Sequence, residues 1–220
     1  MSAPERIGRL HVITDETLQD RFSHVRLAEL AAAGGADRVQ YREKRPLPTR
    51  DLVETARAMR TCLAGSGAEL VINDRADVAL AAGVPALHVG REDLEPEVAR
   101  AILGEDALIG GTANDEDQAV EVAARPVDYL GVGPIFGTSS KARPASVLGL
   151  DALRRIAQAV DRPVIAIGNI TCERVEEVLA AGAYGIAVLS AVVCDPDPRA
   201  ATRRLKDAVD AFRGDRLSGS

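Results

Sequence analysis

DYLGVGPIFGTSSK, residues 128–141, runs from an apolar segment directly into a loop of small hydroxyl residues that ends in a lysine. The apolar part predicts a buried strand, and Pro134 marks the point where its ladder pairing should fail. LDALRRIAQAV, residues 150–160, follows with the spacing of an amphipathic helix. The stretch therefore predicts one strand-then-helix unit, with a polar loop at the carboxyl end of the strand.

The same order of strand and helix recurs along the chain. The other expected strands are RLHVIT (9–14), RVQYREK (38–44), ELVIND (69–74), ALHVG (86–90), ALIGGTA (107–113), PVIAIGNI (163–170) and GIAVLSAVV (185–193). The other expected helices lie at 24–34, 49–65 with Thr49 as its cap, 75–83, 92–104, 115–126, 173–182 and 195 to about 213. Eight such units without a linker between them predict an α/β fold, a single (β/α)8 TIM barrel.

The main alternative fold is an open flavodoxin-like or Rossmann-like sheet. Such a sheet usually needs fewer strands, and the sequence has no GxGxxG motif after its first expected strand. We assign residues 1–213 to one TIM-barrel domain and expect the polar residues 214–220 to form a disordered tail.

Composition limits the class of function. The net charge of −6 gives no broad basic field, which argues against nucleic acid as a partner. The three cysteines are odd in number and lack metal-ligand spacing, so reduced thiols are expected. No apolar run is long enough for a membrane span, and the N-terminus lacks the apolar core of a signal peptide. We expect a cytoplasmic protein without a membrane partner; the sequence leaves open whether it forms a homo-oligomer.

Polar residues gather where the expected strands end, and in a barrel these ends form the active face. In chain order they are Gln40, Arg42, Glu43, Lys44, Asn73, Asp74, Glu92, Asp93, Thr112, Thr138, Ser139, Ser140, Lys141, Gly168, Asn169 and Ser190. All are expected at one mouth of the barrel.

Asp74 and Asp93 come from successive loops and could meet as two carboxylate ligands of Mg²⁺, which also takes waters and phosphate oxygens. Taken singly, Asp74 is better explained as an N-cap of the next helix, and so is Asp93 or its neighbour Glu92. Arg42, Lys44 and Lys141 would add positive charge from two sides of the mouth. A solvated turn for TSSK and a charged strand end for QYREK remain alternatives.

The loops after the seventh and eighth strands are where many barrels hold a phosphate on backbone amides. A second anion position there, together with a metal, suggests two phosphorylated small-molecule substrates, one carrying the leaving group. His11 and His88 are expected to serve packing, because neither has an evident acid–base partner in the sequence. His24 is expected to be a surface residue at a helix N-terminus.

The motifs VQYREK, INDRADVAL, HVGREDL, DYLGVGPIFGTSSK and PVIAIGNIT followed by VLAAGAYGIAVLSA resemble the thiamine phosphate synthase and thiazole tautomerase superfamily. The resemblance runs from about Arg9 to Val193. It implies a Mg²⁺-dependent transferase that joins hydroxymethylpyrimidine diphosphate to hydroxyethylthiazole phosphate, forming thiamine phosphate and pyrophosphate. It also implies dissociative chemistry, in which the pyrimidine cation forms first and the thiazole nitrogen then captures it.

The resemblance further implies a role for each matching residue. Metal binding falls on Asp74 and Asp93, and catalysis on Arg42, Lys44 and Lys141, which would stabilise the departing pyrophosphate. Substrate binding falls on Gln40, Tyr41, Arg42, Glu43, Lys44, Asn73, Thr112, Thr138, Ser139, Ser140, Lys141, Asn169, Leu189 and Ser190.

The chain departs from the family pattern at Thr112, Gly137, Ser140 and Asn169. Asn169 stands where glycine is usual, and asparagine tolerates a positive φ better than most residues do. Two alternative functions therefore stay open. A thiazole tautomerase-like isomerase would use a histidine after the sixth strand, where this chain has Pro134. A non-catalytic paralogue would bind thiazole or thiamine phosphates in a regulatory role, without turnover.

Overall fold

Eight parallel strands form a closed barrel in the computed structural model, which describes residues 6–137 and 146–212. Each strand pairs with its neighbours in the sequence, and β8 closes the barrel against β1. The strands are β1 Leu10–Thr14, β2 Arg38–Tyr41, β3 Glu69–Asn73, β4 Ala86–Val89, β5 Leu108–Ala113, β6 Tyr129–Val132, β7 Val164–Ile167 and β8 Gly185–Val188. The predicted (β/α)8 barrel is confirmed, and the open-sheet alternative is wrong.

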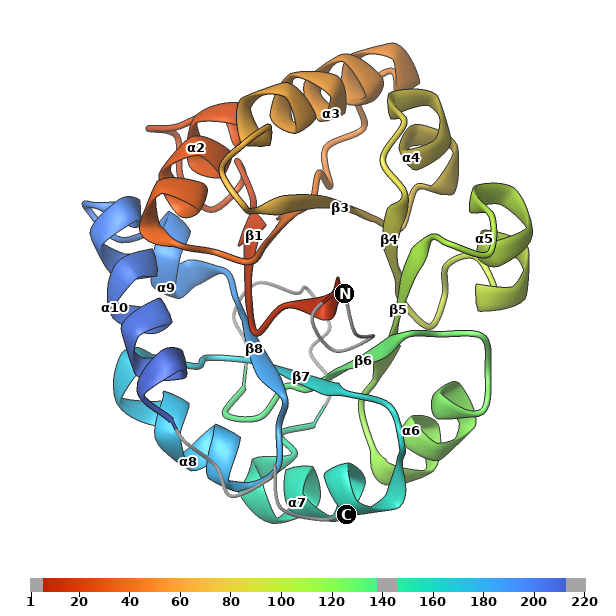
Figure 1. The fold of residues 1–220 in the computed structure, drawn as a ribbon, viewed down its shortest axis with the longest axis vertical. Coiled ribbons are helices and arrows are strands. Elements are labelled where there is room, and N and C mark those ends of the chain that lie inside the picture. The colour runs from red at the N-terminus through yellow and green to blue at the C-terminus, as the bar shows by residue number, and fades with distance from the viewer. Residues whose placement is uncertain (1–5, 138–145, 213–220) are drawn as a thin grey trace.

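The helices form an outer ring around the strands (Figure 1). They are α2 His24–Gly34, α3 Thr49–Leu63, α4 Ala76–Ala82, α5 Pro96–Leu103, α6 Glu116–Ala123, α7 Gly149–Ala159, α8 Val175–Ala180 after the short 3-10 turn Cys172–Arg174, α9 Ser190–Val193 and α10 Pro198–Ala211. In α3 the buried residues Leu52, Ala56, Met59 and Leu63 recur every three or four positions. This spacing gives the helix one apolar face, which packs on the sheet.

Both faces of the sheet are covered, so the strands are apolar almost throughout. All residues of β1, β2, β6 and β8 are buried. The first described residues lie across the amino end of the barrel, where Ile7 is 2% exposed and its carbonyl accepts a hydrogen bond from Arg38. This leaves the carboxyl ends of the strands as the end available for a site.

Several local expectations are wrong, and among them the second strand ends at Tyr41 and not at Lys44, and the seventh at Ile167 and not at Ile170. The eighth strand ends at Val188, and Ser190 begins the short helix α9 instead of continuing the strand. Thr49 is not a side-chain cap, since α3 starts at Thr49 itself with Pro48 as its N-cap residue. The Thr49 hydroxyl accepts a hydrogen bond from Arg75 at 3.0 Å instead. Within the described ranges, no helix is long and apolar enough to cross a membrane.

Candidate active site

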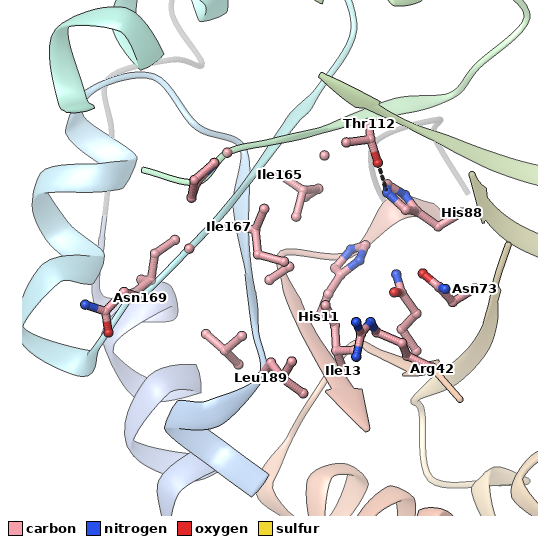
Figure 2. A pocket seen from close by; sticks show the side chains of 18 of the residues that line it. His11, Ile13, Arg42, Asn73, His88, Thr112, Ile165, Ile167, Asn169 and Leu189 are labelled. Carbon is pink, nitrogen blue, oxygen red and sulfur yellow. Dashed lines mark hydrogen bonds between the residues drawn. The ribbon is translucent and has the colours of Figure 1, made fainter. Parts of the chain in front are cut away.

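A cavity of about 570 Å³ opens at the mouth of the barrel, where the strands end (Figure 2). Of the residues predicted from the sequence, those that line it are Gln40, Arg42, Lys44, Asn73, Asp74, Asp93, Thr112, Gly168, Asn169, Leu189 and Ser190. The structure thus brings together side chains separated by up to 150 positions, from Gln40 to Ser190. Thr138, Ser139, Ser140 and Lys141 lie outside the described residues.

Tyr41 and Glu43 are the predicted binding residues whose side chains lie away from the cavity. Successive side chains of an extended segment point to opposite faces, so Gln40, Arg42 and Lys44 share the cavity face. The Tyr41 ring lies behind the strand, with its centroid 4.7 Å from that of His24. The prediction that these two side chains contact a substrate is therefore not supported by their placement.

Arg42 is held by an aspartate that the sequence analysis did not select. Its guanidinium donates a hydrogen bond to the carboxylate of Asp15, which is 1% exposed and directly follows β1. The other carboxylate oxygen of Asp15 accepts hydrogen bonds from the backbone N–H of Thr17 at 2.7 Å and from its hydroxyl. Asp15 directly follows β1, just as the selected Asp74 directly follows β3, and this position was the signal that could have found it.

The second cation of the segment, Lys44, reaches the predicted metal pair. Its Nζ lies 2.5 Å from Asp74 Oδ2. Asp74 and Asp93 lie close enough that each changes the pKa of the other. Burial, and then Asp74, raise the pKa of Asp93 to about 6. Burial also opposes the charge of Asp74, but hydrogen bonds from Asp93 and Lys44 outweigh it and lower the pKa of Asp74.

The helix-cap explanation of these aspartates is wrong. Helix α4 begins at Ala76 after the N-cap residue Arg75, and α5 begins at Pro96 after Glu95. Asp74 adopts a positive φ of 64°, a backbone conformation that non-glycine residues adopt rarely. Asp93 accepts a 2.9 Å hydrogen bond from the backbone N–H of Gly90. Both carboxylates are thus fixed at the cavity by local backbone structure.

The cavity floor is formed by His11, His88 and Tyr129, and sequence reasoning missed this place for both histidines. His88 Nε2 lies 2.9 Å from Thr112 Oγ1, and its Nδ1 lies 3.2 Å from the Tyr129 hydroxyl. His11 packs edge-on against Tyr129, with ring centroids 5.4 Å apart. Burial lowers the pKa of His11 to about 4, so this ring is neutral at physiological pH. Both histidines pack, as expected, but they also face the cavity.

The opposite wall of the cavity follows β7 and β8. Asn169 has a φ of 50°, which agrees with the expectation that asparagine would accept this conformation in place of glycine. Its carbonyl accepts a 2.8 Å hydrogen bond from Arg174. Figure 2 places Asn169 and Leu189 on this wall and Arg42 and Asn73 across the cavity. Two separate ends of the cavity are therefore available to a ligand.

His24 is not the surface residue that was expected. It does begin a helix, but it is 1% exposed, and its Nδ1 lies 2.7 Å from the Thr14 hydroxyl. Burial lowers the pKa of His24, although Glu16 and Glu43 act in the opposite direction. A signal for this burial is hard to find in the sequence, because the partners come from two other loops.

Fold and site together define a (β/α)8 barrel with its cavity at the carboxyl ends of the strands, lined by Arg42, Lys44 and the carboxylates of Asp74 and Asp93. Residues 10–192 match the family model described as thiamine monophosphate synthase. The chain belongs to this family.

Individual relatives agree with the family match. The chain is 46% identical over 208 residues to a thiamine-phosphate synthase of Salinibacter ruber, covering 94% of this chain and 91% of the relative. It is 46% identical over 206 residues to one of Methanoculleus marisnigri, covering 94% and 97%. The solved structure of a thiamine phosphate pyrophosphorylase from Pyrococcus furiosus superimposes with a TM-score of 0.84 at 36% identity, covering 94% and 97%.

Proposed function

We propose that this chain is a transferase that condenses hydroxymethylpyrimidine diphosphate with hydroxyethylthiazole phosphate to give thiamine phosphate and pyrophosphate. The observation that carries the proposal is the meeting of Asp74 and Asp93 with Lys44 at the cavity, with Arg42 on the same wall. Two carboxylates and two positively charged side chains on one cavity wall suit a metal-bound diphosphate. The family relationship supports the same substrates.

The carboxylate pair fits Mg²⁺ by its chemistry. Asp74 and Asp93 offer hard oxygen ligands, and their mutual contact puts two negative groups where only a proton or a cation makes both tolerable. When bound there, Mg²⁺ would neutralise charge on the diphosphate leaving group. The residues of the chain then have to orient the diphosphate and stabilise the charge that grows as it departs.

Arg42 and Lys44 would supply this stabilisation from the wall formed by β2. Asp15 holds the guanidinium of Arg42 in place, so little reorganisation is needed when charge develops on the leaving oxygen. Lys141 is proposed to act on the same diphosphate. A dissociative reaction needs no base on the attacking thiazole nitrogen, and the neutral, buried His11 on the cavity floor is consistent with that.

The remaining polar residues divide between the two ends of the cavity. Gln40, Asn73 and Thr112 offer amide and hydroxyl groups that can hydrogen-bond the pyrimidine ring. Asn169 and Ser190 lie on the opposite wall, where we place the thiazole phosphate. This arrangement would put the thiazole nitrogen across the cavity from the diphosphate, where it could capture the pyrimidine cation once the diphosphate has left.

The test is to incubate the protein with both phosphorylated substrates and Mg²⁺ and to measure thiamine phosphate and pyrophosphate. The two products should appear in equal amounts, and chelation of Mg²⁺ should stop their formation. Tight binding of the thiazole phosphate without product would instead favour the non-catalytic paralogue. The tautomerase alternative is disfavoured by Pro134, which occupies the position of the histidine that such an isomerase would use.

A further inference from the structure

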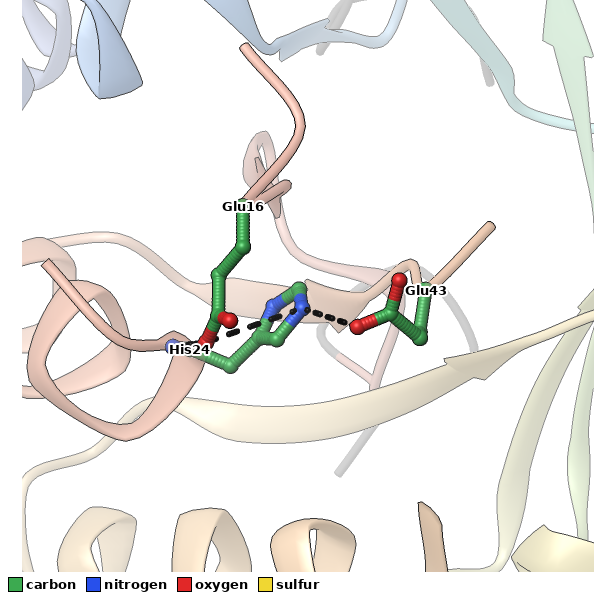
Figure 3. Close-up of side chains that lie close together, drawn as sticks. All are labelled: Glu16, His24 and Glu43. Carbon is green, nitrogen blue, oxygen red and sulfur yellow. Dashed lines mark hydrogen bonds and ion pairs between the residues drawn. The ribbon is translucent and has the colours of Figure 1, made fainter. Parts of the chain in front are cut away.

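A cluster of charged residues lies behind the cavity wall that carries Arg42. It consists of Glu16, His24, Glu43 and Arg45, of which Figure 3 draws the first three. The side chains of His24 and Glu43 are 2% and 3% exposed. The proposed reaction gives none of these four groups a part, and burying several charged groups is costly unless they are paired. The presence of this paired cluster beside the cavity wall therefore needs an explanation.

Both carboxylate oxygens of Glu43 are occupied. Arg45 donates from its backbone N–H at 2.8 Å and from Nε at 3.0 Å to Oε1, and its guanidinium also bonds Oε2. His24 Nε2 lies 3.3 Å from Oε2, and since a carboxylate only accepts, this ring nitrogen carries the proton. Burial alone would raise the pKa of Glu43, but the bonds from Arg45 lower it to about 2.

Glu16 connects this pair to the loop that follows β1. Its carboxylate accepts a 2.6 Å hydrogen bond from the backbone N–H of His24 and another of 2.6 Å from the guanidinium of Arg45. His24 is tied to the end of β1 through the Thr14 hydroxyl at 2.7 Å. The cluster thus joins the loops after two neighbouring strands.

A bound metal ion explains the cluster less well than a network of ion pairs does. Ligand atoms of Glu16, His24 and Glu43 do lie within 4.8 Å of one another. The guanidinium of Arg45, however, already bonds both carboxylates and supplies the positive charge that a cation would bring. A cation would have to displace this guanidinium, so the contacts favour a structural ion network.

The position of Glu43 in the chain gives the network a role. The ladder between β2 and β3 extends only to Tyr41, and residues 42–48 form no helix or strand. Arg42 and Lys44 nevertheless both line the cavity, on either side of Glu43, which points the other way. We propose that Glu43, held by Arg45 and His24, is a positioning residue that keeps Arg42 and Lys44 directed at the substrate diphosphate.

This inference rests on the proposed function, and it is tested with Glu43→Gln, Arg45→Ala and the double variant. Turnover should fall about tenfold or more in each single variant, whereas KM for the thiazole phosphate should stay within about twofold. Calorimetry with Mg²⁺ and pyrophosphate should show that pyrophosphate affinity falls by a factor similar to the fall in turnover. The double variant should lose less than the two single losses combined, because both single changes break the Glu43–Arg45 ion pair. Arg45→Lys should restore part of the turnover.

The matched control is Arg155→Ala, which breaks an exposed 3.0 Å ion pair with Glu116 on the outer ring and should leave all these quantities unchanged. Arg45 is 41% exposed, so its replacement leaves the fold intact where that of Glu43 could disturb it. Wild-type turnover and pyrophosphate affinity in the folded variants would overturn the inference. Equal losses for thiazole phosphate and pyrophosphate would also overturn it. If the wild type forms no thiamine phosphate, the proposed function fails, while pyrophosphate binding still decides the role of Glu43.

Discussion

Mg²⁺ binding to the carboxyl pair should depend on pH between about 5 and 7. The pKa of Asp93 is raised to about 6 in the metal-free protein, first by burial and then by Asp74. The pKa of Asp74 is lowered, so the proton that competes with the metal belongs to Asp93. Mg²⁺ must displace this proton, because a carboxylate binds the metal only when it is ionised.

Competition by one proton with a pKa of about 6 sets how strongly the apparent Mg²⁺ affinity depends on pH. The apparent Mg²⁺ affinity should fall about fourfold at about pH 5.5 and about elevenfold at about pH 5, relative to its value well above the pKa. Calorimetric titration of Mg²⁺ in two buffers of different ionisation enthalpy measures both affinity and proton release. Roughly 0.9 protons should be released per Mg²⁺ at about pH 5, and almost none at about pH 7.5.

Two variants sharpen the test. Asp93→Asn should weaken Mg²⁺ binding and remove its dependence on pH, whereas Glu92→Gln, in the same loop, should retain that dependence. A raised pKa stabilises the folded protein fully below the unfolded value and ceases to do so as pH rises through about 6. Asp93→Asn should therefore raise the Tm of the metal-free protein at about pH 7.5 and change it little at about pH 4. A wild-type affinity that is flat from pH 5 to 8, without proton release, would refute the raised pKa of Asp93.

Three further variants test other parts of the structure. Gly110→Ala would press its Cβ against the ring of Tyr129 at the cavity floor, and should lower the free energy of unfolding by roughly 1–3 kcal/mol in denaturant titrations. Asp15→Asn should free Arg42 and lower kcat about tenfold in steady-state assays; an unchanged kcat would show that Asp15 does not hold the guanidinium for catalysis. Lys141→Ala should lower kcat more than it weakens thiazole phosphate binding, because its proposed partner is the leaving group. Equal losses in both quantities would contradict that role.

The fold could be predicted because its signals are local. Each strand is a short apolar run, each helix carries its own three-to-four periodicity, and a chain that alternates them eight times closes in few ways. The boundary errors arise where a strand gives way to a loop. VLSAVV stays apolar after Val188, and only the geometry at the end of the barrel turns it into the helix α9.

The sequence by itself determined which residues stand at the ends of strands, and therefore the convergence of Asp74, Asp93 and Lys44 on one cavity. It could not determine which side chains of the irregular segment 42–48, beyond the end of the ladder between β2 and β3, face the cavity. Nor could it determine which side chains become buried. The enclosure of His24 and the pairing of Asp15 depend on loops that meet only when the barrel closes. The burial of a side chain and its pairing depend on neighbours that are distant in the sequence. For that physical reason only the tertiary structure decided them.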